Sequence, residues 1–323
     1  MEFFRDTKID WLGKKWYFLG FSLIFSVAGL LSIFFWHHIP LGVDFKGGTQ
    51  IRVAFTQMPN EDHIRHAMDM AGVHQATIQR ISDPSGKAAN KVIIALPISS
   101  ASDTAHDVGR ERVESALAEN YHDSAFNVEQ VEIVGPTAGK QLQHQAEWAT
   151  LYSLIGMLVY LWFRFELIYG VAAVVAVFHD TLITIGAFSL TNKDITLTVI
   201  AAILTLIGYS MNDTIVVFDR IRENLGVSRR EPLHDLVNRS INQTLSRTVI
   251  SSGLTFLTVM SLYLFGGEVL HGFSFALVIG ILIGTYSSIA VAAPMLVAYQ
   301  EWRAKRGKTA ALPAAKKKAG TRA

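Results

Sequence analysis

Long apolar stretches alternate with polar segments along the chain, and there are six such stretches. They cover residues 16–36, 148–163, 167–190, 195–218, 248–265 and 273–299. A helix needs about 20 apolar residues to cross the hydrocarbon core of a bilayer, so the pattern predicts six transmembrane helices. The first stretch is longer than the apolar part of a signal peptide and has no small-x-small cleavage site. We therefore interpret it as a retained anchor.

The segment between the first and second stretches, residues 37–145, has the shorter periodicities of a folded domain outside the bilayer. Its pattern predicts strands at residues 43–55, 76–81, 91–96 and 127–134, helices at 61–72 and 104–121, and a turn at 83–86. The resulting βαββαβ order favours a ferredoxin-like sandwich. The expected fold class is a polytopic α-helical membrane protein with one α+β external domain.

Composition narrows the possible functions. The chain is 50% hydrophobic and 17% charged, with a mean hydropathy of +0.30, whereas soluble proteins are about 25% charged. A soluble enzyme is therefore not indicated. The sequence contains no cysteine, which excludes disulfides, Cys-ligated zinc, iron–sulfur clusters and a thiol nucleophile. The formal net charge is +2 and the basic residues are dispersed, so nucleic-acid binding is not indicated either.

The basic residues also predict the orientation, because Lys and Arg mark the cytoplasmic flanks of membrane helices. Nineteen of the 29 lie in residues 1–15, at position 164, in residues 219–247 or in the tail from residue 303. We therefore expect residues 219–247 to be a cytoplasmic loop and both termini to be cytoplasmic. Residues 37–145 are expected in the periplasm, helices two to six in residues 146–302, and a disordered basic tail at 303–323.

One acidic residue interrupts the fourth apolar stretch. Asp213 lies six residues before Asp219, which places it roughly 9 Å deeper along a helix. A carboxylate at such a depth costs on the order of 2.5–3.5 kcal/mol, and intramembrane acids usually face a bundle interior. Tyr209 lies one turn away on the same face, and Asn212 precedes it. We interpret Asp213 as a protonatable carrier group; a buried acid that is hydrogen-bonded for packing, or hydrated near the interface, is the alternative.

The fifth stretch offers a possible partner for this acid. Polar residues recur on one side of it at three- and four-residue spacing, namely Thr244, Arg247, Ser251, Thr255 and Thr258. If this stripe faces Asp213, Arg247 stabilises the charged carboxylate. Alternatively, Arg247 only extends to the headgroups at the start of its span.

A second buried titratable pair, His179 and Asp180, lies in the third stretch. It is a weaker candidate for an accessory polar site, because adjacent residues point in different directions around a helix.

Two Gly-rich motifs flank the external domain. The first is Gly42-Val43-Asp44-Phe45-Lys46-Gly47-Gly48-Thr49, and the second is Gly135-Pro136-Thr137-Ala138-Gly139. No predicted strand precedes Gly47-Gly48 and no predicted helix begins there, so a phosphate-binding loop is not indicated. We interpret both motifs as hinges or tight turns where the domain meets the membrane.

Histidines are concentrated in the same part of the chain, at positions 37, 38, 63, 66, 74, 106, 122 and 144. His63 and His66 have helical spacing, but the pattern does not place a third ligand beside them. We therefore predict surface histidines, no metal site and no cofactor apart from protons as coupling ions.

These motifs together resemble the SecD/SecF family of protein-export membrane proteins, which is part of the resistance-nodulation-division superfamily. The resemblance rests on Gly-x-Asp-Phe-x-Gly-Gly-Thr at 42–49, Gly-Pro-x-x-Gly at 135–139 and Tyr-Ser-Met-Asn-Asp-Thr-Ile-Val-Val-Phe-Asp-Arg-Ile-Arg-Glu-Asn at 209–224. It covers nearly the whole chain except the tail after about residue 306. The third motif is long and specific, whereas a single Gly-rich motif would be weak.

The resemblance implies a function that periodicity alone does not show. Members of this family pair with SecD in a twelve-helix arrangement, associate with the SecYEG channel and YajC, and use the proton motive force to promote export of unfolded preproteins. Their intramembrane aspartate and arginine match Asp213 and Arg247 here. The resemblance therefore implies an inner-membrane accessory subunit of the translocase that is not an enzyme.

Two other classes remain as alternatives. A proton-driven exporter of small molecules or lipids would belong to the same superfamily, but its external domain would be larger and duplicated. An intramembrane aspartyl protease would need a second catalytic aspartate, for which Asp180 is available. Neither a Gly-x-Gly-Asp motif nor a Tyr-Asp pair accompanies these acids in the sequence.

Overall fold

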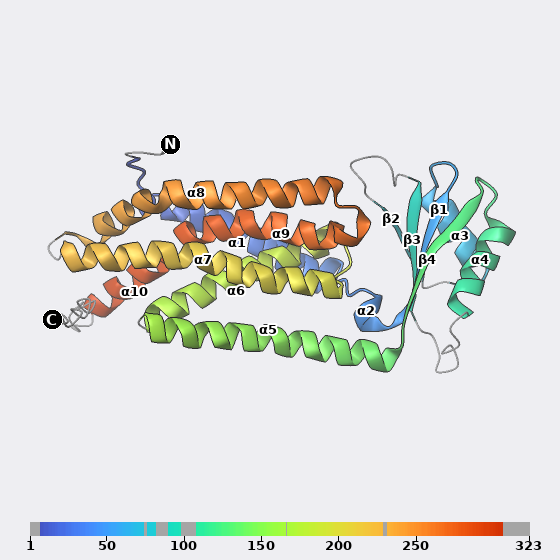
Figure 1. The fold of residues 1–323 in the computed structure, drawn as a ribbon, viewed down its shortest axis with the longest axis horizontal. Coiled ribbons are helices and arrows are strands. Elements are labelled where there is room, and N and C mark those ends of the chain that lie inside the picture. Colours follow the sequence, from blue (N-terminus) through green and yellow to red (C-terminus); the bar gives the residue numbers. More distant parts are fainter. Residues whose placement is uncertain are drawn as a thin grey trace, which may run out of the picture.

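The computed structural model describes residues 7–73, 76–81, 90–97, 108–165, 167–228 and 231–305. Within these ranges it confirms six helical segments that are long and apolar enough to cross a membrane: Lys15–Trp36, Thr137–Arg164, Leu167–Thr191, Leu197–Val227, Leu233–Phe265 and Val269–Arg303. They run side by side as one bundle, and the external domain lies at one end of it (Figure 1). The turn predicted at 83–86, His74, His106 and the tail beyond residue 305 lie outside the described residues.

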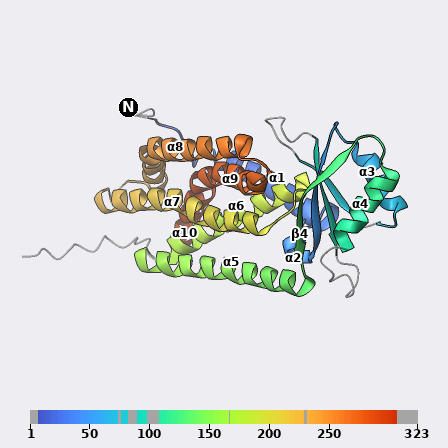
Figure 2. The ribbon, with the colours of Figure 1, turned by 45° about the vertical axis from the view of Figure 1, so that its right-hand side comes forward.

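The last span is the centre of the bundle. It consists of α9 (Glu268–Ser287), a π-helical turn (Ser288–Ala292) and α10 (Ala293–Lys305). Helix α9 packs against α6 (Leu167–Thr191), α7 (Leu197–Val227) and α8 (Leu233–Phe265). By contrast, α5 (Pro136–Arg164) runs along the edge of the bundle (Figures 1 and 2). Only 6% of its most apolar stretch is buried inside the protein.

Small residues allow α9 to approach its neighbours closely. Gly280 faces the side chain of Leu206, and a Cβ added to Gly284 would lie 3.0 Å from the Cβ of Ser210. Both neighbours belong to α7. Gly280 and Gly284 are therefore used for packing within this chain.

An even closer contact joins α1 (Lys15–Leu31) to α6. A Cβ added to Gly186 would lie 2.7 Å from the Cα of Gly29, and the reverse addition gives 3.0 Å. Because the obstacle in each direction is backbone, neither helix can accept a larger residue here without moving. Tyr286 of α9 adds a polar tie, because its hydroxyl donates to the Phe18 carbonyl of α1.

The external domain has the predicted βαββαβ order. Its sheet is antiparallel with the strand order β2-β3-β1-β4, built from β1 (Gly48–Phe55), β2 (Thr77–Arg80), β3 (Lys91–Pro97) and β4 (Phe126–Val134). Helices α3 (Glu61–Met70) and α4 (Val108–Asn120) cover one face (Figure 1). A separate apolar core lies between these layers and includes Ile51, Ile64 and Leu117. The ferredoxin-like prediction is confirmed.

The first predicted strand begins later than the sequence pattern indicated. Residues Val43–Lys46 form a short helix, α2, and β1 starts only at Gly48. Gly47 and Gly48 have φ values of 73° and 148°, which turn the chain from the helix into the strand. Such positive φ values are readily available to glycine and not to residues with a Cβ. The prediction that the strand starts at residue 43 was therefore wrong.

The second Gly-rich motif is also helical. Pro136 is the first residue of α5, where its missing N–H group has no helical partner to lose, and the Gly139 N–H bonds to the Gly135 carbonyl at 2.9 Å. A Cβ on Gly139 would lie 2.8 Å from the Phe45 carbonyl oxygen. The expected turn at 135–139 is therefore the first turn of a helix, packed against α2.

The segment expected as a loop at 219–247 is mostly helical. Helix α7 continues to Val227, and α8 begins at Leu233. The two extensions contact one another, since Asn224 Nδ2 donates to Ser240 Oγ at 2.8 Å. Polar contacts of this kind let both helices continue past their apolar stretches.

The α1–α6 contact generates a stability prediction. We expect Gly186→Ala to lower the free energy of unfolding by about 1–3 kcal/mol, because the new methyl group overlaps the Gly29 backbone. Gly156→Ala on α5 is the matched control, since a Cβ there meets no atom within 4 Å. Denaturant unfolding in detergent should show a loss for the first variant and no loss for the second; equal stability of both variants would contradict the contact.

Candidate functional site

Asp213 is enclosed within the bundle by three helices. Its side chain is 2% exposed, although it lies in an apolar span. Ser252 Oγ of α8 donates to one carboxylate oxygen at 2.7 Å, and Asn212 Nδ2 approaches the other at 3.4 Å. Thr285 of α9 lies beside the carboxylate. A group held in this way can exist as a bonded carboxylate or as a neutral acid.

Arg247 is near this carboxylate but does not touch it. It lies well inside α8, not at the beginning of the helix, and interacts electrostatically with Asp213. Its side chain is exposed and forms no hydrogen bond or ion pair with the part of the chain that the structure describes. The structure therefore places the two residues in one neighbourhood without an ion pair between them.

Tyr209 lies one turn from Asp213 on α7 but is not one of its hydrogen-bond partners in the described part of the chain. It is half-buried and packs against the apolar core of the bundle. Ser252 and Asn212 donate to Asp213, and Thr285 lies beside it. A shared helix face therefore did not produce a tyrosine–aspartate bond.

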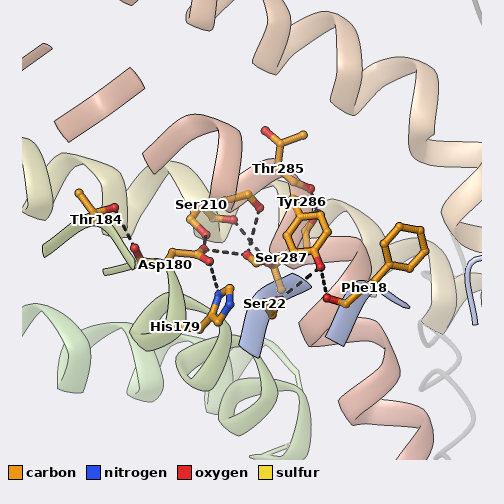
Figure 3. A network of polar contacts seen from close by, with 12 residues as sticks. Phe18, Ser22, His179, Asp180, Thr184, Ser210, Thr285, Tyr286 and Ser287 are labelled. Carbon is orange, nitrogen blue, oxygen red and sulfur yellow. Dashed lines mark hydrogen bonds and ion pairs between the residues drawn. The ribbon is translucent and has the colours of Figure 1, made fainter. Parts of the chain in front are cut away.

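Asp180 is the more completely buried of the two intramembrane acids, with 0% exposure. Figure 3 shows three side chains converging on it. Ser210 Oγ of α7 and Ser287 Oγ of α9 donate to one oxygen at 2.5 and 2.7 Å, and His179 Nδ1 lies 2.9 Å from the other. Although adjacent in sequence, His179 and Asp180 therefore do meet.

Ser210 and Ser287 were not identified as site residues from the sequence. Both are small and occur among many other hydroxyl residues in the spans, so composition does not distinguish them. The one available signal is spacing, since Ser210 lies three residues before Asp213 on α7. A helix places such residues on related faces.

The two acids share their supporting helices. Helix α7 carries Asp213 and also donates Ser210 to Asp180. Helix α9 places Thr285 beside Asp213 and Ser287 on Asp180. A change in the bonding of either carboxylate therefore acts on the same pair of helices.

A second polar region lies where the external domain meets the bundle. The Gly42 N–H donates to the Ile195 carbonyl at 2.9 Å, and the Ile195 N–H donates to the Pro40 carbonyl at 2.7 Å. The Asp44 carboxylate accepts a bond of 2.9 Å from the Leu197 N–H. Phe45 is 3% exposed and belongs to the apolar core of the bundle.

The rest of the first Gly-rich motif packs inside the domain. Thr49 is buried at the start of β1, and a Cβ on Gly109 of α4 would lie 2.5 Å from its hydroxyl oxygen. The motif therefore contacts both parts of the protein.

A cavity of about 230 Å³ opens between the sheet and the connection from α6 to α7. Charged and polar groups from both sides line it, including Arg52, Arg80, Glu132, Lys193, Asp194 and His271. Burial raises the pKa of Asp194, and the hydrogen bond from Gln79 opposes this change. Burial lowers the pKa of Lys193. The cavity is thus a place where the charged forms of both groups are disfavoured.

The described external histidines lie outside any group of side chains that could hold a metal ion. His63 Nδ1 lies 2.5 Å from Asp123 Oδ2 on the surface of the domain. Among the described residues, no three His, Cys, Asp or Glu side chains are grouped so that they could hold a metal ion. His63 therefore pairs with an acid.

Comparison with known proteins gives two family matches. Residues 113–302 match the family described as protein export membrane protein SecD/SecF, C-terminal, and residues 37–57 match the SecD/SecF GG motif. The protein translocase subunit SecF of Koribacter versatilis is 54% identical, over 97% of this chain and 96% of that protein. The SecF of Calditerrivibrio nitroreducens is 44% identical, over 90% of this chain and 94% of that protein.

Solved structures are similar as well. A crystal structure of SecDF from Thermus, described as a translocon-associated membrane protein, has a TM-score of 0.80 and 34% identity. The alignment covers 92% of this chain but only 39% of that chain. SecDF in a super-membrane-facing form has a TM-score of 0.66 at 35% identity, over 95% of this chain and 40% of that chain.

The Asp180 cluster predicts a stability effect. Asp180→Ala removes the acceptor for two buried hydroxyls, and each unsatisfied polar group costs about 1–3 kcal/mol. We expect a loss of that size in the free energy of unfolding. Asp219→Ala is the control, because Asp219 is 49% exposed and only forms surface ion pairs with Arg164 and Arg222. The free energy of unfolding of the two variants is compared in detergent. If Asp180→Ala loses no more than Asp219→Ala, the Asp180 cluster contributes little to stability.

Proposed function

This chain belongs to the SecD/SecF family of protein-export membrane proteins, and from this premise we propose that it promotes preprotein export with energy from the proton motive force. It is an accessory subunit of the Sec translocase, as its SecF relatives are named. We also propose its coupling ion, its partners and its direction of insertion. We therefore propose that this chain acts in transport and not in catalysis.

The observation that carries the coupling proposal is the enclosure of Asp213. An ionisable residue inside a membrane span is expensive to bury and usually marks an ion pathway. Here it is 2% exposed, bonded by Ser252 and close to Arg247. When Asp213 is charged, it accepts the serine bond and attracts the guanidinium. When it takes up a proton, that attraction is lost and Arg247 is released.

This switch acts between α7 and α8. Asp213 belongs to α7, whereas Ser252 and Arg247 belong to α8. Moving one charge through the membrane potential yields about 2.3 kcal/mol per 100 mV, which is enough to bias a two-state arrangement of helices. Each proton would therefore shift the packing of α7 against α8. We predict that the external domain tilts in response.

We further propose a SecD partner, the SecYEG channel, YajC and unfolded preproteins as the interacting molecules. The SecD partner is supported by relatives named as SecF subunits and by the SecDF structure, of whose chain the alignment covers 39%. The exposed apolar faces of α1, α5 and α8 are available for that partner or for lipid. We place the protein in the bacterial inner membrane, with both termini cytoplasmic and residues 37–145 periplasmic.

The geometry does not favour a protease. An aspartyl protease needs two carboxylates that share one proton. Asp180 accepts bonds from Ser210 and Ser287, whereas Asp213 accepts from Ser252 and Asn212. Each acid therefore has its own set of donors.

Asp213→Asn tests the coupling proposal. The amide keeps the shape of the side chain but cannot titrate, so the variant should assemble normally and lose the stimulation of export by a proton gradient. The measurement is preprotein translocation in membrane vesicles that contain the partner subunits, with and without the gradient. Asp219→Asn on the same helix is the matched control, because its side chain is 49% exposed. Full stimulation of the Asp213→Asn variant would refute the proposed coupling.

Arg247→Lys tests the partner of this acid. An ammonium cannot reproduce the planar guanidinium fork, so gradient-dependent export should fall if Arg247 responds to Asp213. Arg239→Lys is the control on the same helix, since Arg239 pairs with Glu231 at 2.6 Å near the start of α8. If lysine at position 247 supports export as well as arginine does, a headgroup contact is sufficient to explain the residue.

A further inference from the structure

Asp44 of the first Gly-rich motif makes a contact that the sequence does not reveal. It lies in α2, between the external sheet and the bundle, and one carboxylate oxygen accepts a hydrogen bond from the Leu197 N–H at 2.9 Å. Leu197 is the first residue of α7, the helix that carries Asp213. The residue before it, Thr196, makes no capping bond with its own side chain. The acid that caps α7 therefore comes from a distant part of the chain.

Helix physics makes this a favourable contact. The first amides of a helix have no intrahelical acceptor and carry a partial positive charge. A carboxylate placed there gains both a charge-assisted hydrogen bond and a favourable interaction with the helix dipole. The neighbouring backbone bonds of Gly42 and Ile195 end on the connection before α7, whereas the Asp44 bond reaches the helix itself.

On the domain side, Asp44 is fixed to the centre of the sheet. Helix α2 is followed directly by Gly47 and then by β1, which pairs with both β3 and β4. A displacement at Asp44 is therefore a displacement of the start of the sheet.

On the membrane side, the connection is one unbroken helix. Helix α7 runs without a break from Leu197 to Val227. Asp213 follows Leu197 by sixteen residues, or about 24 Å at helical rise. Such a helix moves as a unit, so a displacement of α7 at Asp213 also displaces its first turn.

We propose that Asp44 is a positioning residue for proton coupling, and that its bond to the first amide of α7 links the external domain to the helix that carries Asp213. The inference rests on the proposed function, because it takes Asp213 as the coupling group. Coupling between two sites is reciprocal. A shift of α7 on protonation therefore reaches β1 through Asp44, and a shift of the domain acts back on Asp213. The competing explanation is a cap that only stabilises the end of α7.

A new capping residue, placed in the chain directly before α7, distinguishes the link from a cap that only stabilises the helix end. Asp44→Ala removes the distant cap, and Asp44→Ala combined with Thr196→Asp supplies an acid at the residue before the helix, where acids cap well. The second variant restores the cap without the link. Asp62→Ala is the control, because it removes an exposed acid from the first turn of α3, within the external domain.

Two measurements are made in vesicles that contain the partner subunits. Asp44→Ala should raise amide hydrogen exchange at residues 197–200 about fivefold and lower gradient-dependent export about fivefold. The double variant, Asp44→Ala with Thr196→Asp, should regain the exchange protection but not the export. Asp62→Ala should change neither the exchange nor the export. Recovery of export in the double variant, or normal export by Asp44→Ala alone, would overturn the proposal.

A third measurement decides the question even if the new cap fails to form. Hydrogen exchange at residues 48–55 should change when a proton gradient is imposed on the unmodified protein, and this response should vanish in Asp44→Ala. A response that persists in Asp44→Ala, or is missing from the unmodified protein, contradicts the link. Normal export by Asp213→Asn would instead contradict the proposed function, whatever the Asp44 variants show.

Discussion

A carboxylate buried among apolar helices requires donors, because the charge and lone pairs that water would solvate must be satisfied by the protein. This requirement organises the bundle around two acids. Asp213 draws Ser252 of α8 toward α7, and Asp180 draws Ser210 of α7 and Ser287 of α9 toward α6. Four helices are thereby tied by bonds to two side chains. The arrangement of the membrane part depends on these bonds as well as on apolar packing.

The same requirement explains why small residues surround the acids. A serine hydroxyl reaches a carboxylate on the next helix only if the two backbones are close, and Gly284 of α9 provides that approach beside Ser210. Gly29 and Gly186 allow a similarly close approach of α1 and α6. Glycine costs helix stability in a soluble protein. In this bundle it permits the interhelical hydrogen bonds and contacts on which association in a membrane relies.

The sequence predicted the large features well, because each has a strong period or composition. Six apolar stretches define the spans, and the βαββαβ order follows from alternation and helical spacing. The short helix α2 was missed because four residues carry no periodicity. The donors to Asp180 were missed because serines from two helices, α7 and α9, converge on it only after packing. Asp213 stood out in the sequence because a lone acid in an apolar stretch is conspicuous, whereas Asp44 lies in a polar segment, where an acid is ordinary.

The junction shows why flexibility cannot be deduced from glycine content. Gly47 and Gly48 adopt positive φ values that turn the chain into β1, and Gly139 is a place of close approach to Phe45. These glycines therefore allow tight geometry, and none needs to be a free hinge. With both motifs packed together, the external domain is connected to the bundle by defined contacts. A domain held in this way can respond to a helix, because a displacement at one end of a stiff contact must appear at the other.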